Sequence, residues 1–180
     1  MKSYHWPRVK AEQAQMVKLL AMRTPVLSID PGSTGGAVFW VNGVPVEGVP
    51  FRAFNGYGDL RLRAARLKPR LVILEEAFIG KGIKAALRLG FWRGFAAATA
   101  HQAFIGEQTL LEVSQGAWKT ELPRDGIPEG APWDSAAHAL ACELLAERYP
   151  LAIVPRDDGI RSALGIGHWW HRKAGRCTIP

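Results

Sequence analysis

One stretch constrains the fold more than any other: residues 26 to 38 have the sequence VLSIDPGSTGGAV. Val, Leu and Ile lead to Asp30, and Pro31 and Gly32 then turn the chain before a second apolar run. This pattern predicts a buried strand that ends at a carboxylate, followed by a turn whose glycines let the backbone approach a ligand closely. A buried carboxylate is costly unless a cation or a hydrogen-bond donor meets it. Alone, an Asp-Pro-Gly turn is more typical of a plain link between strands, so the rest of the chain decides.

Composition narrows the class of protein. The chain has 180 residues, of which 48% are hydrophobic, enough for one globular domain with a sizeable core. Its formal net charge of +7 favours a polyanionic partner such as nucleic acid. No apolar run is long enough to span a membrane, no signal peptide is visible, and Cys142 and Cys177 lack metal-ligand spacing. We therefore expect a cytoplasmic protein with reduced thiols and no membrane partner.

The order of the predicted elements indicates the domain organisation. Residues 1 to 24 have an amphipathic pattern that predicts an additional N-terminal helix, and residues 174 to 180 predict a loose tail. Between them, residues 25 to 173 predict one domain, with irregular connections at 55–59 and 114–132. Strands are expected at 26–29, 36–41, 44–51, 71–74 and 110–113, and helices at 60–67, 83–103, 134–148 and 160–173.

This succession of elements predicts an α/β fold of ribonuclease-H type, in which a mixed β-sheet is flanked by helices. Asn42 and Gly43 predict a tight hairpin turn between the second and third strands. A doubly wound nucleotide-binding sheet is the alternative. The glycines from 32 to 36 argue against it, because they lead into a strand, whereas a dinucleotide-binding fingerprint opens a helix.

Four acidic residues are candidates for a catalytic metal site. Asp30 and Glu75 each follow a predicted buried strand, and Asp157 and Asp158 open the last predicted helix. If the two strands are neighbours, Asp30 and Glu75 lie side by side, and the helix start could close over them. Clustered carboxylates repel unless divalent cations lie among them, and oxygen ligands favour Mg²⁺ or Mn²⁺. Two such ions suit phosphodiester hydrolysis, so the acids predict a nuclease. The alternative for Asp157 and Asp158 is plain helix capping.

Five segments occur in an order and spacing that are typical of a known family. They are LSIDPGSTGGAVFW, LVILEEAF, GKGIKAALRLGFWRGFAAATA, LLEVSQGAWK and RDDGIRSALGIGHWWHRK. Together they resemble the RuvC family of Holliday-junction resolvases over about residues 25 to 173, and are most similar to the branch found in phages and prophages. The resemblance places Asp30 at the first metal-binding aspartate and Glu75 at the acid of the next motif. It places Asp157 and Asp158 at the acids that open the last helix.

The resemblance also implies an activity and partners. It implies a homodimer that holds two Mg²⁺ ions, with Mn²⁺ able to substitute, and that makes paired nicks across a four-way DNA junction. Family members usually carry a further acid one turn into the last helix, where this chain has Arg161 and Ser162. The alternative function is therefore a junction-binding protein of the same fold with weak or no cleavage. A sugar-kinase-like phosphotransferase is a further alternative, but 180 residues leave little room for its second domain.

Aromatic and basic residues near the acids are candidates for DNA contacts. Phe78 follows the Glu75 strand and could stack at the centre of a junction, although core packing explains it about as well. The basic candidates are Lys81, Lys84, Arg88 and Lys119.

A second alignment places the last motif at Asp134 and His138, which lie four residues apart on one face of a predicted helix. We give it less weight, because Asp134 is explained as a helix cap and a histidine on an Ala-rich helix is more often packed.

Overall fold

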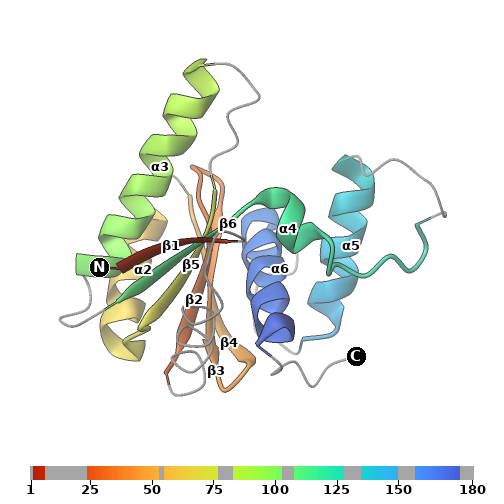
Figure 1. The fold of residues 1–180 in the computed structure, drawn as a ribbon, viewed down its shortest axis with the longest axis horizontal. Coiled ribbons are helices and arrows are strands. Elements are labelled where there is room, and N and C mark those ends of the chain that lie inside the picture. The colour runs from red at the N-terminus through yellow and green to blue at the C-terminus, as the bar shows by residue number, and fades with distance from the viewer. Residues whose placement is uncertain are drawn as a thin grey trace.

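A computed structural model describes residues 2–6, 24–52, 55–76, 83–102, 108–127, 135–149 and 157–174. Its strands form one six-stranded mixed sheet in the order β1-β6-β5-β2-β3-β4 (Figure 1). Strand β3 runs antiparallel to β2 and β4, and the other neighbours are parallel. The strands are β1 (Lys2–Trp6), β2 (Val26–Asp30), β3 (Gly36–Val41), β4 (Val44–Pro50), β5 (Leu71–Glu75) and β6 (Thr109–Val113).

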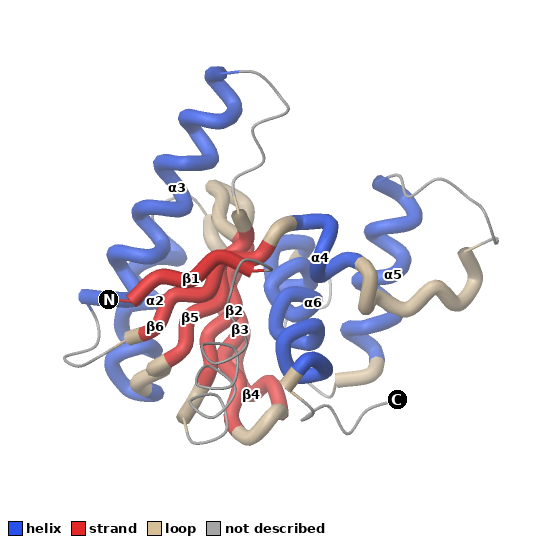
Figure 2. The backbone as a smooth tube through the Cα atoms, in the orientation of Figure 1, coloured by secondary structure: helices blue, strands red, loops and turns tan. Residues whose placement is uncertain are grey.

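Helices cover both faces of the sheet, which confirms the predicted fold class. Figure 2 shows α2 and α3 on one side and α4, α5 and α6 on the other. Helix α6 packs directly on β2 and β3, and α5 packs on α6. None of the described helices has the length and apolar character needed to cross a bilayer. The helices are α2 (Asn55–Leu67), α3 (Ile83–Gln102), α4 (Gln115–Lys119), α5 (Ser135–Glu147) and α6 (Asp158–Lys173).

The hairpin between β3 and β4 forms at the predicted turn. Asn42 has φ of 54° and Gly43 has φ of 80°. Two successive positive φ values define a type I′ turn, whose twist matches that of the flanking strands, and Asn-Gly is its favoured sequence. The turn therefore fixes the register in which β3 and β4 begin to pair, with Val41 opposite Val44.

A buried hydroxyl group joins α6 to the sheet. Ser28, on β2, donates to the backbone oxygen of Ala163 at 2.6 Å and accepts from the Trp40 indole at 2.9 Å. All three residues are fully buried. Since a buried polar group without a partner costs free energy, this network fixes the position of α6 relative to the centre of β2.

Three expectations about local structure are wrong. Residues 55 to 59 are not a loop but the first turn of α2, because Gly56 packs against the backbone of Pro50 and Tyr57 stacks on Phe51, with ring centroids 4.2 Å apart. Residues 115 to 119 form the short helix α4, whose Trp118 is buried in the core. These tertiary contacts override the local preferences of the two segments.

The N-terminal expectation is wrong for the residues that can be compared. Lys2–Trp6 forms the edge strand β1, which pairs parallel with β6 and so satisfies backbone groups that an unpaired edge would expose. The remainder of the predicted N-terminal helix, residues 7 to 23, lies outside the described residues, as does most of the predicted tail. The predicted domain boundaries stay predictions.

The buried His168 predicts that the protein loses stability in acid. Its Nδ1 atom lies 2.7 Å from the Tyr149 hydroxyl, and burial, with a smaller effect of Arg172, lowers its pKa to about 4 from 6.5. Below pH 6.5 this histidine is therefore protonated in the unfolded chain but remains neutral in the folded chain. The free energy of unfolding should fall between pH 6.5 and 4, by up to roughly 3 kcal/mol. Urea unfolding at pH 7 and pH 4.5 should show a smaller loss for His168→Gln than for wild type. Equal losses would contradict this account.

Candidate active site

Asp30 and Glu75 lie side by side at one edge of the sheet. Strands β2 and β5 are parallel neighbours, and Ile29 pairs with Leu74. The next residue on each strand is the acid, so the two carboxyl groups emerge at the same end of adjacent strands. This is the juxtaposition that the sequence predicts for the two strand-ending acids.

The environment of this acid pair disfavours two negative charges. Burial raises the pKa of Asp30 well above its usual range, and the charge of Glu75 raises it further, while a hydrogen bond from Ser162 opposes the shift. Burial likewise raises the pKa of Glu75, against the effects of Trp118 and Lys119. Two carboxyl groups this close share a proton or require a cation between them.

A divalent cation fits the chemistry of the acid pair. Both residues offer hard oxygen ligands of the kind that Mg²⁺ prefers, and a bound cation would remove the repulsion that raises the pKa of Asp30. Across the described parts of the chain, no three His, Cys, Asp or Glu residues gather as ligands of one ion. An ion held by Asp30 and Glu75 would have further positions in its shell for water, for substrate oxygens or for another acid of the chain.

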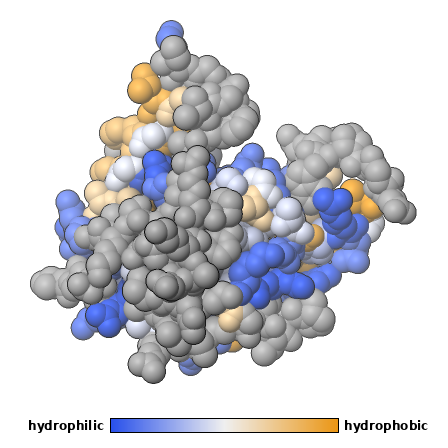
Figure 3. Space-filling model, in the orientation of Figure 1, coloured by the Kyte–Doolittle hydropathy of each residue, from blue (hydrophilic) through white to orange (hydrophobic). Residues whose placement is uncertain are grey.

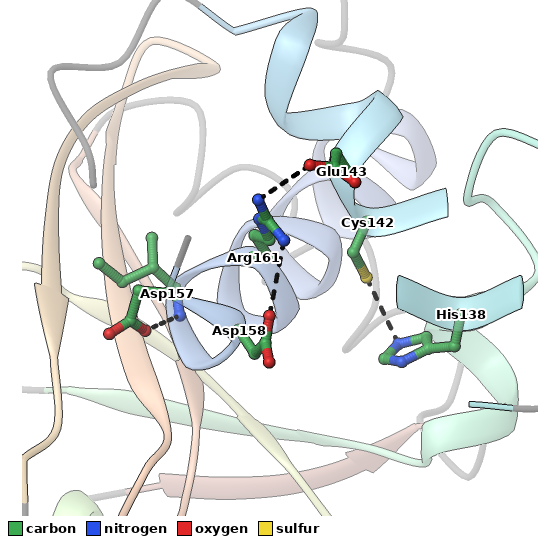
Figure 4. A network of polar contacts seen from close by, with 7 residues as sticks. His138, Cys142, Glu143, Asp157, Asp158 and Arg161 are labelled. Carbon is green, nitrogen blue, oxygen red and sulfur yellow. Dashed lines mark hydrogen bonds and ion pairs between the residues drawn. The ribbon is translucent and has the colours of Figure 1, made fainter. Parts of the chain in front are cut away.

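Asp157 and Asp158 occupy the start of α6 in different ways (Figure 4). The Asp157 carboxylate accepts from the backbone N–H of Ile160 at 3.0 Å and caps the helix. Asp158 is an ion-pair partner of Arg161 at 3.5 Å, and its side chain is 89% exposed. These contacts give Asp157 the capping role that was the alternative, and, among the described residues, neither acid joins Asp30 and Glu75 in a group of three metal-ligating side chains. Their roles as metal ligands stay predictions.

The start of α6 nevertheless lies directly against the turn that follows Asp30. A Cβ atom on Gly159 would come within 2.2 Å of the Gly35 carbonyl carbon, so the two backbones are in contact. One turn further on, Ser162 reaches the Asp30 carboxylate with its side chain. Arg161 instead pairs with Glu143 at 3.3 Å and with Asp158 (Figure 4). Of the two residues at the usual acid position, Ser162 is the one that meets the acid pair.

Ser162→Asp is expected to place a third carboxylate beside Asp30. With three acids, the site should bind Mg²⁺ more tightly, and the concentration for half-maximal junction cleavage should fall by about tenfold. Without metal, the added charge should destabilise the fold, because it increases the repulsion that already raises the pKa of Asp30. Ser162→Asn, which adds similar volume without charge, is the matched control. If the aspartate and asparagine variants show the same metal dependence, Ser162 does not mark an acid position of the site.

His138 and Lys119 border the acid pair. His138 Nε2 lies 3.4 Å from Cys142 Sγ (Figure 4), and its ring packs edge-on against Trp118. Burial, and then the charge of Lys119, lower its pKa to about 4, so the imidazole is neutral at pH 7. The Lys119 ammonium acts on both Asp30 and Glu75 as well as on His138. Asp134 lies outside the described residues.

Two of the residues predicted to contact DNA, Lys84 and Arg88, lie on helix α3. Lys84 and Arg88 lie exposed on the first half of α3, and an Arg88 Nη2 atom lies 3.4 Å from the Ser33 hydroxyl. Phe78 and Lys81 lie outside the described residues. The sequence did not single out Ser33, and only its place two residues after the Asp-Pro pair could have drawn attention to it.

Comparison with known proteins defines the class of this chain. It resembles the structure of T. thermophilus RuvC in complex with Holliday junction substrate, with a TM-score of 0.55, 21% identity, and coverage of 85% of this chain and 97% of the other. This likeness shows the fold, which is ribonuclease-H-like. No established family profile matches the sequence.

Two curated relatives show which proteins this chain is similar to in sequence. Both carry the name crossover junction endodeoxyribonuclease RuvC. The relative from Chlorobium phaeovibrioides is 27% identical over 159 residues, 78% of this chain and 77% of the relative. The relative from Chloroflexus aurantiacus is 31% identical over 119 residues, 65% of each chain. The chain is thus similar to RuvC Holliday-junction resolvases over 65% to 78% of its length. Its place in the phage and prophage branch stays a prediction.

Proposed function

We propose that this protein is a metal-dependent endonuclease that resolves four-way DNA junctions by paired hydrolysis of phosphodiester bonds. One observation carries the proposal: Asp30 and Glu75 are adjacent at the ends of β2 and β5, in a chain that is similar to RuvC proteins. The two curated relatives are named as crossover junction endodeoxyribonucleases. The net charge of +7 is suited to a DNA substrate. The predicted location is the cytoplasm of a bacterial or phage-infected cell.

The residues around the acid pair have distinct tasks in this proposal. Asp30 and Glu75 would hold Mg²⁺, or Mn²⁺ in its place, which activates water and stabilises the leaving oxygen when bound. Ser162 keeps the Asp30 carboxylate oriented through its hydrogen bond. Lys119 brings a positive charge to the pair, where it can offset the charge of an approaching phosphate. The buried Trp118 acts on Glu75 and opposes the rise in the pKa of its carboxyl group.

A junction-binding protein without turnover is the second candidate function. The observation that favours it is Ser162, a neutral residue that meets Asp30 at the place where the resemblance implies an acid. An assay on a labelled four-way junction distinguishes the nuclease from the binding protein, with linear duplex as the control substrate. The proposal expects tight binding in EDTA and symmetric cleavage of the junction on addition of Mg²⁺ or Mn²⁺. Binding without cleavage in either metal would support the second candidate.

The exposed part of α3 supports the proposal of a homodimer. One end of α3 projects beyond the sheet, and apolar side chains gather along it (Figures 1 and 3). Leu87 and Phe91, four residues apart on one face, are 70% and 55% exposed. A second copy of this chain could cover both by pairing its own α3.

Replacing Leu87 and Phe91 together by Glu should therefore yield a monomer. Sedimentation velocity measures the oligomeric state, and Leu62→Glu, at a 66% exposed position on α2, is the matched control and should not change it. A double variant that remains a dimer would exclude this face of α3 as the interface.

A further inference from the structure

The turn after Asp30 is held rigidly from three sides. The Tyr57 hydroxyl donates to the Gly32 carbonyl at 3.3 Å, and the Phe51 N–H donates to the Gly35 carbonyl at 2.7 Å. On the third side Gly159 packs against the same turn without room for a side chain. Groups that the turn presents to solvent are therefore preorganised, and binding a ligand costs little ordering entropy.

Ser33 is half-buried in this turn, next to the exposed Thr34, and meets a guanidinium group. The Arg88 Nη2 atom lies 3.4 Å from the Ser33 hydroxyl. Arg88 is exposed, and none of the carboxylates that the structure describes forms an ion pair with it. Arg93, on the same helix, differs because it ion-pairs with Glu112. The Arg88 guanidinium thus keeps its charge and most of its five N–H donors available for an anion.

We propose that Ser33 and Arg88 together hold a backbone phosphate of the DNA strand, next to the phosphate that is cut. This inference rests on the proposed function and assigns the pair a positioning role. Asp30 lies three residues before Ser33, so a phosphate on the pair would be bound directly beside the acid pair. A guanidinium and a hydroxyl both donate hydrogen bonds, and a phosphate offers several oxygens that accept them. Such contacts position the DNA backbone and carry no information about base sequence.

The arrangement sets the register of the cleaved strand. A DNA strand carries its phosphates at a regular spacing, so fixing one of them on a rigid turn also fixes its neighbour. A phosphate held by Ser33 and Arg88 would place the adjacent one at Asp30 and Glu75 before any reaction occurs. Correct positioning of this kind contributes to rate, because small displacements of the reacting group are costly.

Junction binding in EDTA over a series of salt concentrations tests the role of Arg88. Arg88→Gln should weaken binding and lower the slope of log affinity against log salt by about one unit, the value for one lost phosphate contact. Arg88→Lys should keep the slope and lose part of the affinity, because it retains the charge without the planar fork. Arg61→Gln, an equal charge change at an exposed site of α2, is the matched control and should leave the slope closer to wild type.

Ser33→Ala tests whether the two residues act on one phosphate. Alone it should weaken binding by about three- to tenfold, the effect of one lost hydrogen bond. In the Arg88→Gln background it should add little, because both residues would hold the same group. In cleavage assays both single variants should raise KM and also lower kcat, because the phosphate at the acid pair is then positioned less well. A contact that only supports the fold would change thermal stability and leave the salt slope unaltered.

The outcomes separate this inference from the proposed function. Suppose that wild type binds and cleaves the junction, and that Arg88→Gln shows the same salt slope as Arg61→Gln. The phosphate role of Arg88 and Ser33 is then overturned, while the proposed nuclease activity is supported. If wild type binds the junction without cleaving it and Arg88→Gln flattens the salt slope, the phosphate role is supported and the proposed nuclease activity is contradicted. A wild-type protein that binds no junction overturns both.

Discussion

Asp30→Asn should abolish junction cleavage and leave junction binding intact or tighter. A neutral amide is a much weaker ligand for a divalent cation than a carboxylate, so the loss is several kcal/mol of transition-state stabilisation, or roughly three orders of magnitude in rate. Binding should persist because the variant removes a negative charge that faces the phosphates. Single-turnover cleavage and binding of the same labelled junction measure the two effects separately, with Asp59→Asn on the exposed side of α2 as the control.

The same variant has a second consequence that does not depend on activity. The raised pKa of Asp30 means that the folded state resists ionisation, so stability is lost as pH rises above the unfolded value near 4. Asp30→Asn removes this cost, and urea unfolding at pH 7 should show the variant to be more stable than wild type. A variant that cleaves at the wild-type rate would mean that Asp30 is not part of the catalytic site. A less stable variant would mean that the electrostatic account of the acid pair is wrong.

Gly159→Ala should impair both folding and cleavage, because it separates α6 from the turn after Asp30. The new Cβ atom would come within 2.2 to 2.5 Å of backbone atoms of Gly35 and Thr34, and backbone atoms cannot yield as a flexible side chain can. Overpacking of this kind costs about 3 kcal/mol. The forced shift would also move Ser162 away from Asp30, and a displacement near 1 Å is enough to reduce the rate by about 100-fold.

Gly94→Ala provides the contrast for this substitution. Gly94 lies inside α3 with no atom near the place of a Cβ, so alanine there should stabilise the protein by roughly 0.5 to 1 kcal/mol. Urea unfolding of both variants and their single-turnover rates test the comparison. If Gly159→Ala is as stable and as active as wild type, close contact between α6 and the turn is not required for the site.

Much of the sheet follows from local sequence patterns. The apolar runs before Asp30 and Glu75 predict β2 and β5, and Asn42-Gly43 predicts the hairpin of β3 and β4, because these signals depend only on residues close in the chain. The start of α2 could not be predicted in this way. Gly56 disfavours a helix locally and is helical here because it fits against Pro50, a contact that exists only in the folded chain.

The candidate site shows the same division. The strand order brings together Asp30 and Glu75, so a topological argument predicts their adjacency. An acid at a helix start, by contrast, can be either a helix cap or a metal ligand, and the sequence does not distinguish the two roles. The structure shows that Asp157 caps the helix, because its carboxylate accepts a hydrogen bond from the Ile160 N–H. The resemblance singles out Ser162, at the usual acid position of the last helix, but does not distinguish it from Arg161 as the residue that meets Asp30. The contact of Ser33 with Arg88 joins residues distant in sequence, and no local pattern marks it.

The most direct test of the central claim uses a supercoiled plasmid that extrudes a cruciform. The purified wild-type protein is bound to the plasmid in EDTA, Mg²⁺ is added, and the products are separated on a gel. A junction-resolving endonuclease makes paired nicks across the cruciform, so the account predicts conversion to linear plasmid, with no conversion by Asp30→Asn. Plasmid that stays supercoiled with wild-type protein bound, in both Mg²⁺ and Mn²⁺, would contradict the account.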